Sequence, residues 1–443
     1  MPPGSRLPGV IQAVLYARDP VGFLERHQRR YGDVFSLPFP AFGTLVYVAD
    51  PDLVKRVFTG DPTTFRAGTA NARALEPVLG RFSLLTLDGD DHMRQRKLLL
   101  PPFHGEAVRR YRDLIAEIAA REVERWPVGR PFELRPRMQA ITLEVILRAV
   151  FGVRGEERLG RFRALLPRLT DSTGVQMWIP FLRRNLGPWS PWGRFLRMRA
   201  EVDELVYDEI RRRRAEPGAA ERDDVLSLLL GARHEDGSPM SDRELRDELI
   251  TLLTAGHETS ATALAWAFER LLRNPGAMRE LRAEVERGGD DYADAVVKET
   301  LRVRPVITDV ARLVTTDVEL GRWIVPAGTI VVPAIALLQL LPQVYSDPYV
   351  FRPERFLAGQ PAPYTWIPFG GGVRRCLGAA FAQLEIRTVL QTVVARAELR
   401  APDAAPERTR LRNVTLVPQR GARVVMDGRP ATVEPAAATA TYA

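Results

Sequence analysis

Cysteine is almost missing from this chain of 443 residues, and its scarcity excludes two kinds of structure. The one cysteine, Cys376, can form no intramolecular disulfide, and by itself it cannot ligate an iron–sulfur cluster. Histidine is also rare, with five residues that form no cluster in the sequence. The pair His257-Glu258 begins a pattern typical of zinc-protease helices, but Ala261 stands where the second histidine is needed. We therefore expect neither a disulfide nor a zinc site.

Long apolar runs are missing from the N-terminal region. The segment from Met1 to Gly9 is rich in proline and glycine and contains no stretch long enough for a membrane span or a signal peptide. A single cysteine also fits a reducing compartment. We therefore expect a cytoplasmic protein with no membrane anchor.

Lysine is nearly replaced by arginine. Only three of the 63 basic residues are lysine, and the formal charge is +8. Arginine binds phosphate well, so nucleic acid has to be considered as a partner. The arginines are spread among 55 acidic residues, however, with no basic arm and no known reader motif. This distribution favours solvated helix faces, and we expect no binding of nucleic acid.

Most of the remaining sequence has helical periodicity. Apolar residues at three- and four-residue spacing predict helices over 104–126, 137–151, 156–170 and 194–215. Alternating patterns predict a β-hairpin over 34–48, and residues 60–83 are expected to form a long irregular loop. The segment 172–193 is rich in tryptophan and proline, which is compatible with a mobile lid and equally with a packed surface loop.

The most informative stretch runs from Phe369 to Gly378 and contains the lone cysteine. Glycines precede the thiol, Arg374 and Arg375 stand directly before it, and helix formers follow from Ala379 to about residue 395. A cysteine at a helix N-terminus lies where unpaired N–H groups stabilise a thiolate, which is a good ligand for haem iron. The alternative is a buried, unreactive cysteine.

The pattern Phe369-x-x-Gly372-x-Arg374-x-Cys376-x-Gly378 resembles the haem-thiolate signature of the cytochrome P450 family. The resemblance implies a mainly α fold with a small β part, in which a triangular helical body holds haem b between a long central helix and the helix after the cysteine. It implies a single domain over 1–429, and the composition of 430–443 predicts a disordered tail. Residues of the motif expected at the cofactor are Phe369, Gly370, Arg374, Cys376 and Gly378, with Cys376 as the iron ligand.

A second motif lies in a predicted helix of some 33 residues that starts at a capping box, Ser241 to Glu244, and ends before Pro275. Its middle reads Ala255-Gly256-His257-Glu258-Thr259. The glycine and a threonine able to bond back to the carbonyl of Ala255 would open the local hydrogen-bond ladder. The resemblance implies that Ala255 and Gly256 lie at the haem and that Glu258 and Thr259 are catalytic, moving protons.

Three further positions are expected at the haem propionates. His92 and Arg96 are four residues apart on a predicted helix and so share one face, which by itself also fits two exposed polar residues. By resemblance, His92, Arg96 and Arg312 bind propionates, with Arg374 as a fourth candidate.

A structural network is expected elsewhere. Glu299 and Arg302 share a helix face, and by resemblance Arg355 joins them in a buried cluster that supports the fold; a surface ion pair is the alternative. The segment Gln339-Leu340-Leu341-Pro342 departs from the family pattern, which leaves its role in haem or surface contacts open.

The resemblance implies a monooxygenase that uses O₂ to oxidise a hydrophobic small molecule, such as a fatty acid, a terpene, a steroid or another natural product. A monomer would receive electrons from a separate ferredoxin or flavodoxin and its reductase, because no flavin motif is present. Arg374, Arg375 and Arg387 would steer that acidic partner. A peroxide-driven oxidase and a non-catalytic haem sensor are the alternatives, and the acid–threonine pair argues against the first.

Overall fold

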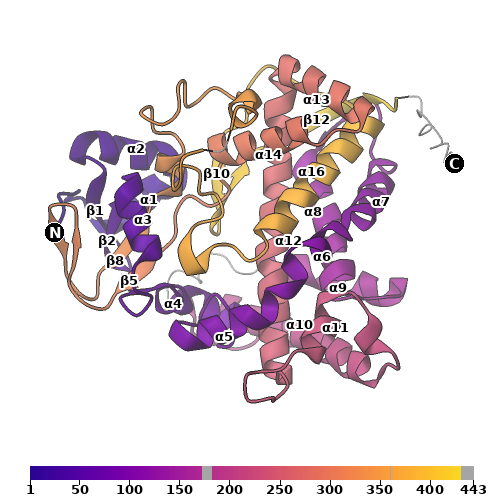
Figure 1. Ribbon diagram of the computed structural model, residues 1–443, viewed down its shortest axis with the longest axis horizontal. Helices are drawn as coiled ribbons and strands as arrows, with labels where there is room; N and C mark the ends of the chain where they lie inside the picture. Colours follow the sequence, from indigo (N-terminus) through magenta and orange to yellow (C-terminus); the bar gives the residue numbers. More distant parts are fainter. Residues whose placement is uncertain (172–181, 360, 431–443) are drawn as a thin grey trace, which may run out of the picture.

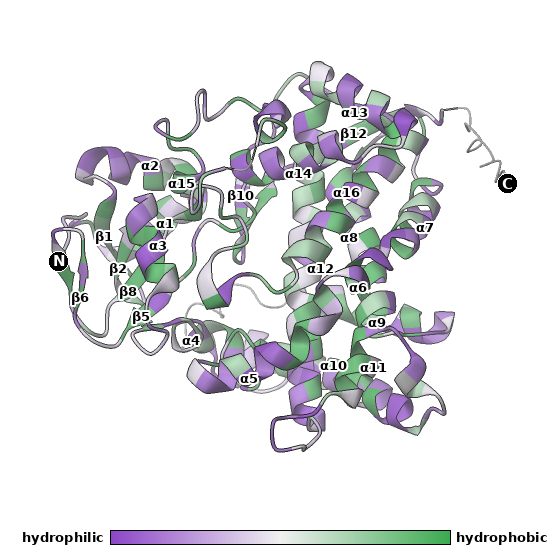
Figure 2. Cartoon of the chain, in the orientation of Figure 1, coloured by the Kyte–Doolittle hydropathy of each residue, from purple (hydrophilic) through white to green (hydrophobic). Residues whose placement is uncertain are grey.

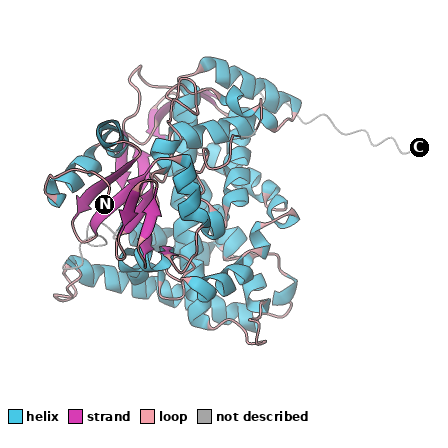
Figure 3. Ribbon diagram, turned by 60° about the vertical axis from the view of Figure 1, so that its left-hand side comes forward, coloured by secondary structure: helices cyan, strands magenta, loops and turns pink. Residues whose placement is uncertain are grey.

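The computed structural model describes residues 1–171, 182–359 and 361–430, and its largest sheet lies at one side of a mostly helical body (Figures 1 and 3). The largest sheet has the strand order β1-β2-β8-β5-β3. Its hairpin pairs Val34 with Val48 and Phe39 with Gly43 in antiparallel register, and β2 then pairs with β8 in parallel. The bounds are β1 (Val34–Phe39), β2 (Gly43–Val48), β3 (Phe65–Arg66), β5 (Arg312–Val314) and β8 (Ile330–Pro333).

Three smaller sheets complete the β part, with strand orders β10-β11, β4-β12-β9 and β6-β7. Their bounds are β4 (Pro131–Glu133), β6 (Val318–Leu320), β7 (Trp323–Val325), β9 (Glu398–Arg400), β10 (Thr409–Arg412), β11 (Thr415–Pro418) and β12 (Arg423–Gly428).

The helices form the body around the site. They are α1 (Gly9–Arg18), α2 (Pro20–Tyr31), α3 (Pro51–Thr59), α4 (Ala67–Leu79), α5 (Gly89–Leu99), α6 (Glu106–Arg109), α7 (Arg112–Val123), α8 (Leu134–Val145), α9 (Glu156–Asp171), α10 (Pro191–Ala215), α11 (Val225–Gly231), α12 (Asp242–Leu272), α13 (Pro275–Arg287), α14 (Asp291–Val303), α15 (Ile335–Leu338) and α16 (Ala379–Arg396). Within the described parts of the chain, no helix combines the length and apolar character needed to cross a membrane.

Helix α12 is the central element, and its start follows from local chemistry. The Ser241 hydroxyl accepts the N–H of Glu244, and the Glu244 carboxylate accepts the N–H of Ser241, which completes the predicted capping box. The helix then runs for 31 residues between α8, α10, α14 and α16. Its first turns are hydrophilic and its later turns mostly apolar (Figure 2). A helix packed on several sides needs such an apolar surface, and the prediction of a long central helix is confirmed.

The prediction of an irregular loop over 60–83 is wrong, because α4 occupies residues 67–79. The residue before this helix, Arg66, makes no side-chain cap. The N–H groups of Gly68 and Thr69 are instead accepted by the Asp88 carboxylate, at 2.7 and 2.6 Å. Because this acceptor lies some 20 residues further along the chain, no local start signal marks the helix.

The predicted helix over 104–126 is also divided, because α6 ends at Arg109 and α7 begins at Arg112. Gly105, whose φ is +61°, separates α6 from a short 3-10 turn before it. Of the segment 172–193, residues 172–181 lie outside the described residues, and α10 already begins at Pro191. A disordered tail is predicted over 430–443, and residues 431–443 of this segment also lie outside the described residues.

Candidate functional site

The loop that carries Cys376 is folded tightly onto the protein. The Cys376 N–H donates to the carbonyl oxygen of Phe369 at 2.9 Å, and α16 begins three residues after the cysteine, as predicted. Gly370 and Gly372 have φ values of +66° and +62°, which favour glycine. A Cβ at Gly372 would also lie 1.9 Å from the carbonyl oxygen of Phe58. The glycines therefore fix the loop against α3 and present the cysteine at the start of α16.

The environment of the Cys376 thiol has two opposing effects. Burial raises its pKa, whereas a hydrogen bond from the Gly378 backbone and the positive charges of Arg96 and Arg375 lower it. The side chain is nevertheless exposed by surface area. The expected thiolate-stabilising charge is present, and burial is the larger of the two effects.

A cluster of positive charge lies beside this loop. Burial, and after it the charge of Arg374, lowers the pKa of Arg312 to about 10. Burial also lowers the pKa of Arg96, on α5. His92, one turn before Arg96, is only 3% exposed, and burial, then Arg374 and Arg96, lower its pKa to about 3. The structure thus brings all four predicted propionate residues into one electrostatic group.

Asp88 is the acid within this group, and sequence reasoning missed it. Its carboxylate pairs with Arg374 at 2.6 Å. Arg374 also donates to the carbonyl oxygen of Leu84 at 3.1 Å. Since Asp88 caps α4 as well, one carboxylate joins α4, the segment 80–88 and the cysteine loop. Asp88 is the one acid whose charge contributes to the pKa shifts of His92, Arg312 and Arg374. The arginines of this cluster therefore carry more positive charge than Asp88 balances.

The motif in α12 contributes the opposite wall. The Thr259 hydroxyl donates to the carbonyl oxygen of Ala255 at 2.6 Å, as the sequence predicts. Ala255 is exposed although it lies in the middle of the central helix, and Gly256 and Thr259 are partly exposed. A Cβ at Gly256 would meet the Ile146 side chain at 3.0 Å, so glycine allows close packing there. The next residue, Ser260, hydrogen-bonds Glu385 of α16, which brings α12 against the helix that follows the cysteine.

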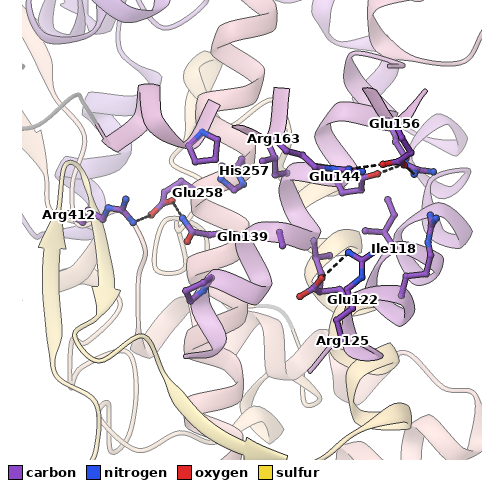
Figure 4. Close-up of a pocket in the computed structure, with 17 residues that line it drawn as sticks. Ile118, Glu122, Arg125, Gln139, Glu144, Glu156, Arg163, His257, Glu258 and Arg412 are labelled. Atoms are coloured by element: carbon purple, nitrogen blue, oxygen red, sulfur yellow. Dashed lines mark hydrogen bonds and ion pairs between the residues drawn. The ribbon is translucent and has the colours of Figure 1, made fainter. Parts of the chain in front are cut away.

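Glu258 points to the other side of α12 and is held by several side chains (Figure 4). Arg135 forms an ion pair with its Oε1, and Gln139 Nε2 donates to its Oε2 at 2.7 Å. Arg412, from β10, lies 3.7 Å from Oε1. Glu258, Gln139 and Arg412 border a cavity of about 500 Å³ between α7, α8, α9 and α12. The partners lie more than 100 residues from Glu258 in the sequence, so no local pattern indicates them.

The three residues of the expected structural network also meet. Arg302 Nε lies 2.7 Å from Glu299 Oε2, both side chains are fully buried, and Arg355 Nε lies 3.3 Å from Glu299 Oε1. Gln339, in the segment that departs from the family pattern, is buried beside them and donates to the carbonyl oxygen of Leu301 at 2.9 Å. This side chain therefore contacts the end of α14 rather than the surface.

The predicted docking arginines differ from one another in the structure. Arg374 is paired with Asp88, and Arg387 pairs with Asp294 at 3.0 Å. Arg375 is exposed and has no ion pair within the described residues. Only Arg375 thus retains a charge that is available at the surface.

The donor set fits an iron porphyrin. One thiol can supply a soft axial ligand. Beside it, the three arginines Arg96, Arg312 and Arg374 carry more charge than the single acid Asp88 balances, which suits two added carboxylates, and neutral His92 lies among them. The glycines before the cysteine let a flat ligand approach the backbone closely, and Ala255 on α12 is exposed.

Comparison with known proteins agrees with this chemistry. The family model described as Cytochrome P450 matches residues 1–426. Two similar proteins of Mycobacterium tuberculosis are cytochrome P450 135B1, 46% identical over 96% of this chain and 91% of the relative, and cytochrome P450 138, 42% identical over 97% of each.

Solved structures show the same fold. A cyanobacterial CYP120A1 with bound retinoic acid has a TM-score of 0.84 at 23% identity and covers 97% of this chain and 99% of its own. The haem domain of cytochrome P450DA has a TM-score of 0.82 at 25% identity, with 97% and 96% covered. The predicted mainly α fold is confirmed, and the chain belongs to the cytochrome P450 family of haem-dependent monooxygenases.

Proposed function

We propose that Cys376 is the axial thiolate ligand of haem b in this monooxygenase. The observation that carries the proposal is the placement of the only cysteine at the start of α16, where the Gly378 backbone and Arg96 favour its anionic form. The Gly-rich loop fixes the position of the cysteine, since the Cys376 N–H donates to the carbonyl oxygen of Phe369. Phe369, Gly370 and Gly378 would then lie at the cofactor as parts of the same loop.

The two propionates would be held by Arg96, Arg312 and Arg374, with His92 as a neutral donor. Each added carboxylate offsets buried positive charge that Asp88 alone leaves unbalanced. Arginine suits this role because its planar donors match a carboxylate. Neutral His92 can donate one hydrogen bond without adding further charge.

The proton-handling groups would be Thr259 and Glu258. The Thr259 hydroxyl donates its hydrogen bond to the Ala255 carbonyl oxygen, so the hydroxyl oxygen can accept a hydrogen bond from a bound reactant. Glu258 lies on the side of α12 that borders the charged cavity, where Arg135 and Gln139 hold its two oxygens. Glu258 would take up protons from this polar cavity and pass them towards Thr259, the next residue of the helix.

The haem, when bound, supplies the chemistry that reduces O₂ and inserts one of its oxygen atoms into a C–H or C=C bond. The chain's own residues would position a hydrophobic small molecule beside Ala255 and Thr259. Electrons would come from a separate ferredoxin or flavodoxin with its reductase, and exposed Arg375 would contribute to docking this acidic partner. A monomer in the cytoplasm remains the expected form.

Isotope labelling tests the reaction directly. The purified protein, reduced by a ferredoxin and its reductase, is given a substrate that shifts its ferric spectrum under ¹⁸O₂. We expect a product that carries one labelled oxygen atom. Product labelled only from ¹⁸O water, or electron consumption with no oxygenated product, would contradict a monooxygenase with this site.

A further inference from the structure

Phe58, near the end of α3, is a buried aromatic residue that contacts two parts of the proposed haem site. Its side chain is 4% exposed and belongs to the core cluster that α3 shares with the largest sheet. The guanidinium carbon of Arg312 lies over its ring, 5.5 Å from the ring centre. The ring of Tyr364, in the segment that leads into the cysteine loop, stacks near it with the two ring centres 6.2 Å apart. One side chain thus connects β5, which carries Arg312, to the chain that leads to Cys376.

The glycine at position 371 is explained by this ring. The φ of Gly371 is −156°, which any residue can adopt, whereas Gly370 and Gly372 have positive φ values. A Cβ at Gly371 would lie 2.8 Å from the Phe58 ring and 3.0 Å from the Tyr364 ring. Glycine is therefore needed at this position because the two rings approach the backbone closely, and not because of the backbone conformation.

Arg312 has no acidic partner of its own. It is 6% exposed, its Nη1 donates to the carbonyl oxygen of Ala311 at 2.8 Å, and it forms no ion pair within the described residues. Arg374 differs, because it is already paired with Asp88. A buried guanidinium without a carboxylate is costly unless another group stabilises its charge. The face of an aromatic ring attracts a cation but carries no net charge, so the charge of Arg312 stays available to a ligand carboxylate.

We propose that Phe58 is a positioning residue whose ring holds the guanidinium of Arg312 in place for a haem propionate. The proposal rests on the proposed function, in which Arg312 binds a propionate. It adds a residue of α3 to that site. Because the contact joins a cation to a ring, the electron distribution of the ring should matter as well as its volume.

Haem retention measures this role without depending on turnover. The ferric protein is mixed with excess apomyoglobin, and the rate of haem transfer is compared between the wild-type protein, Phe58→Leu, Arg312→Gln and the double variant. Phe65→Leu is the matched control, because Phe65 is buried in the same core cluster and has no cation over its ring within the described residues. In a further variant, Phe58 is replaced by pentafluorophenylalanine, which keeps the shape of the ring and removes its negative face.

We expect haem transfer to be about tenfold faster in Phe58→Leu and to stay within about twofold of the wild-type rate in Phe65→Leu. In the Arg312→Gln background, Phe58→Leu should add less than about twofold, because the interaction that it removes is already lost. The fluorinated variant should behave like Phe58→Leu, and it tests the ring's charge distribution even if the leucine variant folds poorly.

An equal effect of Phe58→Leu with and without Arg312, or a fluorinated variant that retains haem like the wild-type protein, would overturn the proposal, since the ring would then act only through packing. Loss of the thiolate-type carbon monoxide band in Phe58→Leu but not in Arg312→Gln would overturn it too, because the ring would then support the cysteine loop instead. Unchanged haem transfer in Arg312→Gln would refute the propionate role of Arg312, on which the proposal rests.

Discussion

The hydroxyl of Thr259 donates to the backbone carbonyl oxygen of Ala255, 2.6 Å away and one turn earlier on α12. A threonine that bonds back in this way competes with the helical hydrogen bonds of its own turn. Gly256 lies within this turn, and Ala255 and Thr259 are both accessible there. The central helix thus presents a polar oxygen and accessible small residues at its midpoint.

Replacing Thr259 by alanine should separate electron use from product formation. The product formed per electron should fall about tenfold or more, with hydrogen peroxide released instead, because the proposed proton-handling oxygen is lost. Thr259→Ser keeps a hydroxyl and should retain most of the coupling. The measurement compares NADH consumed, peroxide and product for a substrate that shifts the ferric spectrum. Equal coupling in all three proteins would favour a non-catalytic haem protein.

Arg302→Ala should destabilise the fold by about 3 to 5 kcal/mol, because it leaves the buried carboxylate of Glu299 without its main partner. The guanidinium also lies 4.7 Å over the ring of Tyr345, and that contact is lost too. Arg26→Ala removes one side of an exposed pair with Asp19 and should cost less than about 1 kcal/mol. Urea unfolding followed by circular dichroism compares the two. Similar midpoints would show that the buried network contributes little.

Glu385 should make stability depend on pH. Burial raises the pKa of this carboxyl to about 8, against an ordinary value of 4.5. Between these values the folded state binds more protons than the unfolded state, so the stabilisation from this group is complete below pH 4.5 and is lost as the pH rises towards 8. One pKa unit corresponds to roughly 1.4 kcal/mol.

Glu385→Gln should therefore gain stability relative to the wild-type protein as the pH rises from 5 to 8. Exposed Glu157→Gln serves as the control and should show no such trend. Unfolding free energies measured at several pH values decide the matter. A constant difference between Glu385→Gln and the wild-type protein would contradict a neutral buried acid.

Charge reversal at Arg375 tests the proposed docking of an acidic redox partner. Arg375→Glu should slow the association step of ferredoxin-driven reduction about tenfold at low ionic strength, and added salt should reduce the difference. Arg322→Glu alters the charge equally at a hairpin far along the chain from the cysteine loop, and should have little effect. Stopped-flow reduction at several salt concentrations provides the rates. Identical rates for both variants would remove Arg375 from the docking surface.

Much of the architecture is predictable because its signals are local. The capping box at Ser241 and the glycines before Cys376 each lie within a few residues of the element that they define. Helix α4 and the partners of Glu258 are different. The start of α4 is stabilised by Asp88, and Glu258 is bound by Arg135 and Arg412. Contacts between residues that are far apart in the sequence produce no periodic pattern in it, so the sequence alone does not indicate them.

The central claim is that Cys376 is the thiolate ligand of the haem iron. Carbon monoxide is added to the dithionite-reduced protein, and the Soret band is compared between the wild-type protein and Cys376→His, with bound haem quantified in each. We predict a Soret maximum characteristic of thiolate ligation in the wild-type protein and its loss in the variant, in which imidazole replaces the thiolate. The same thiolate-type band in Cys376→His, or a wild-type protein that binds no haem, would contradict the account.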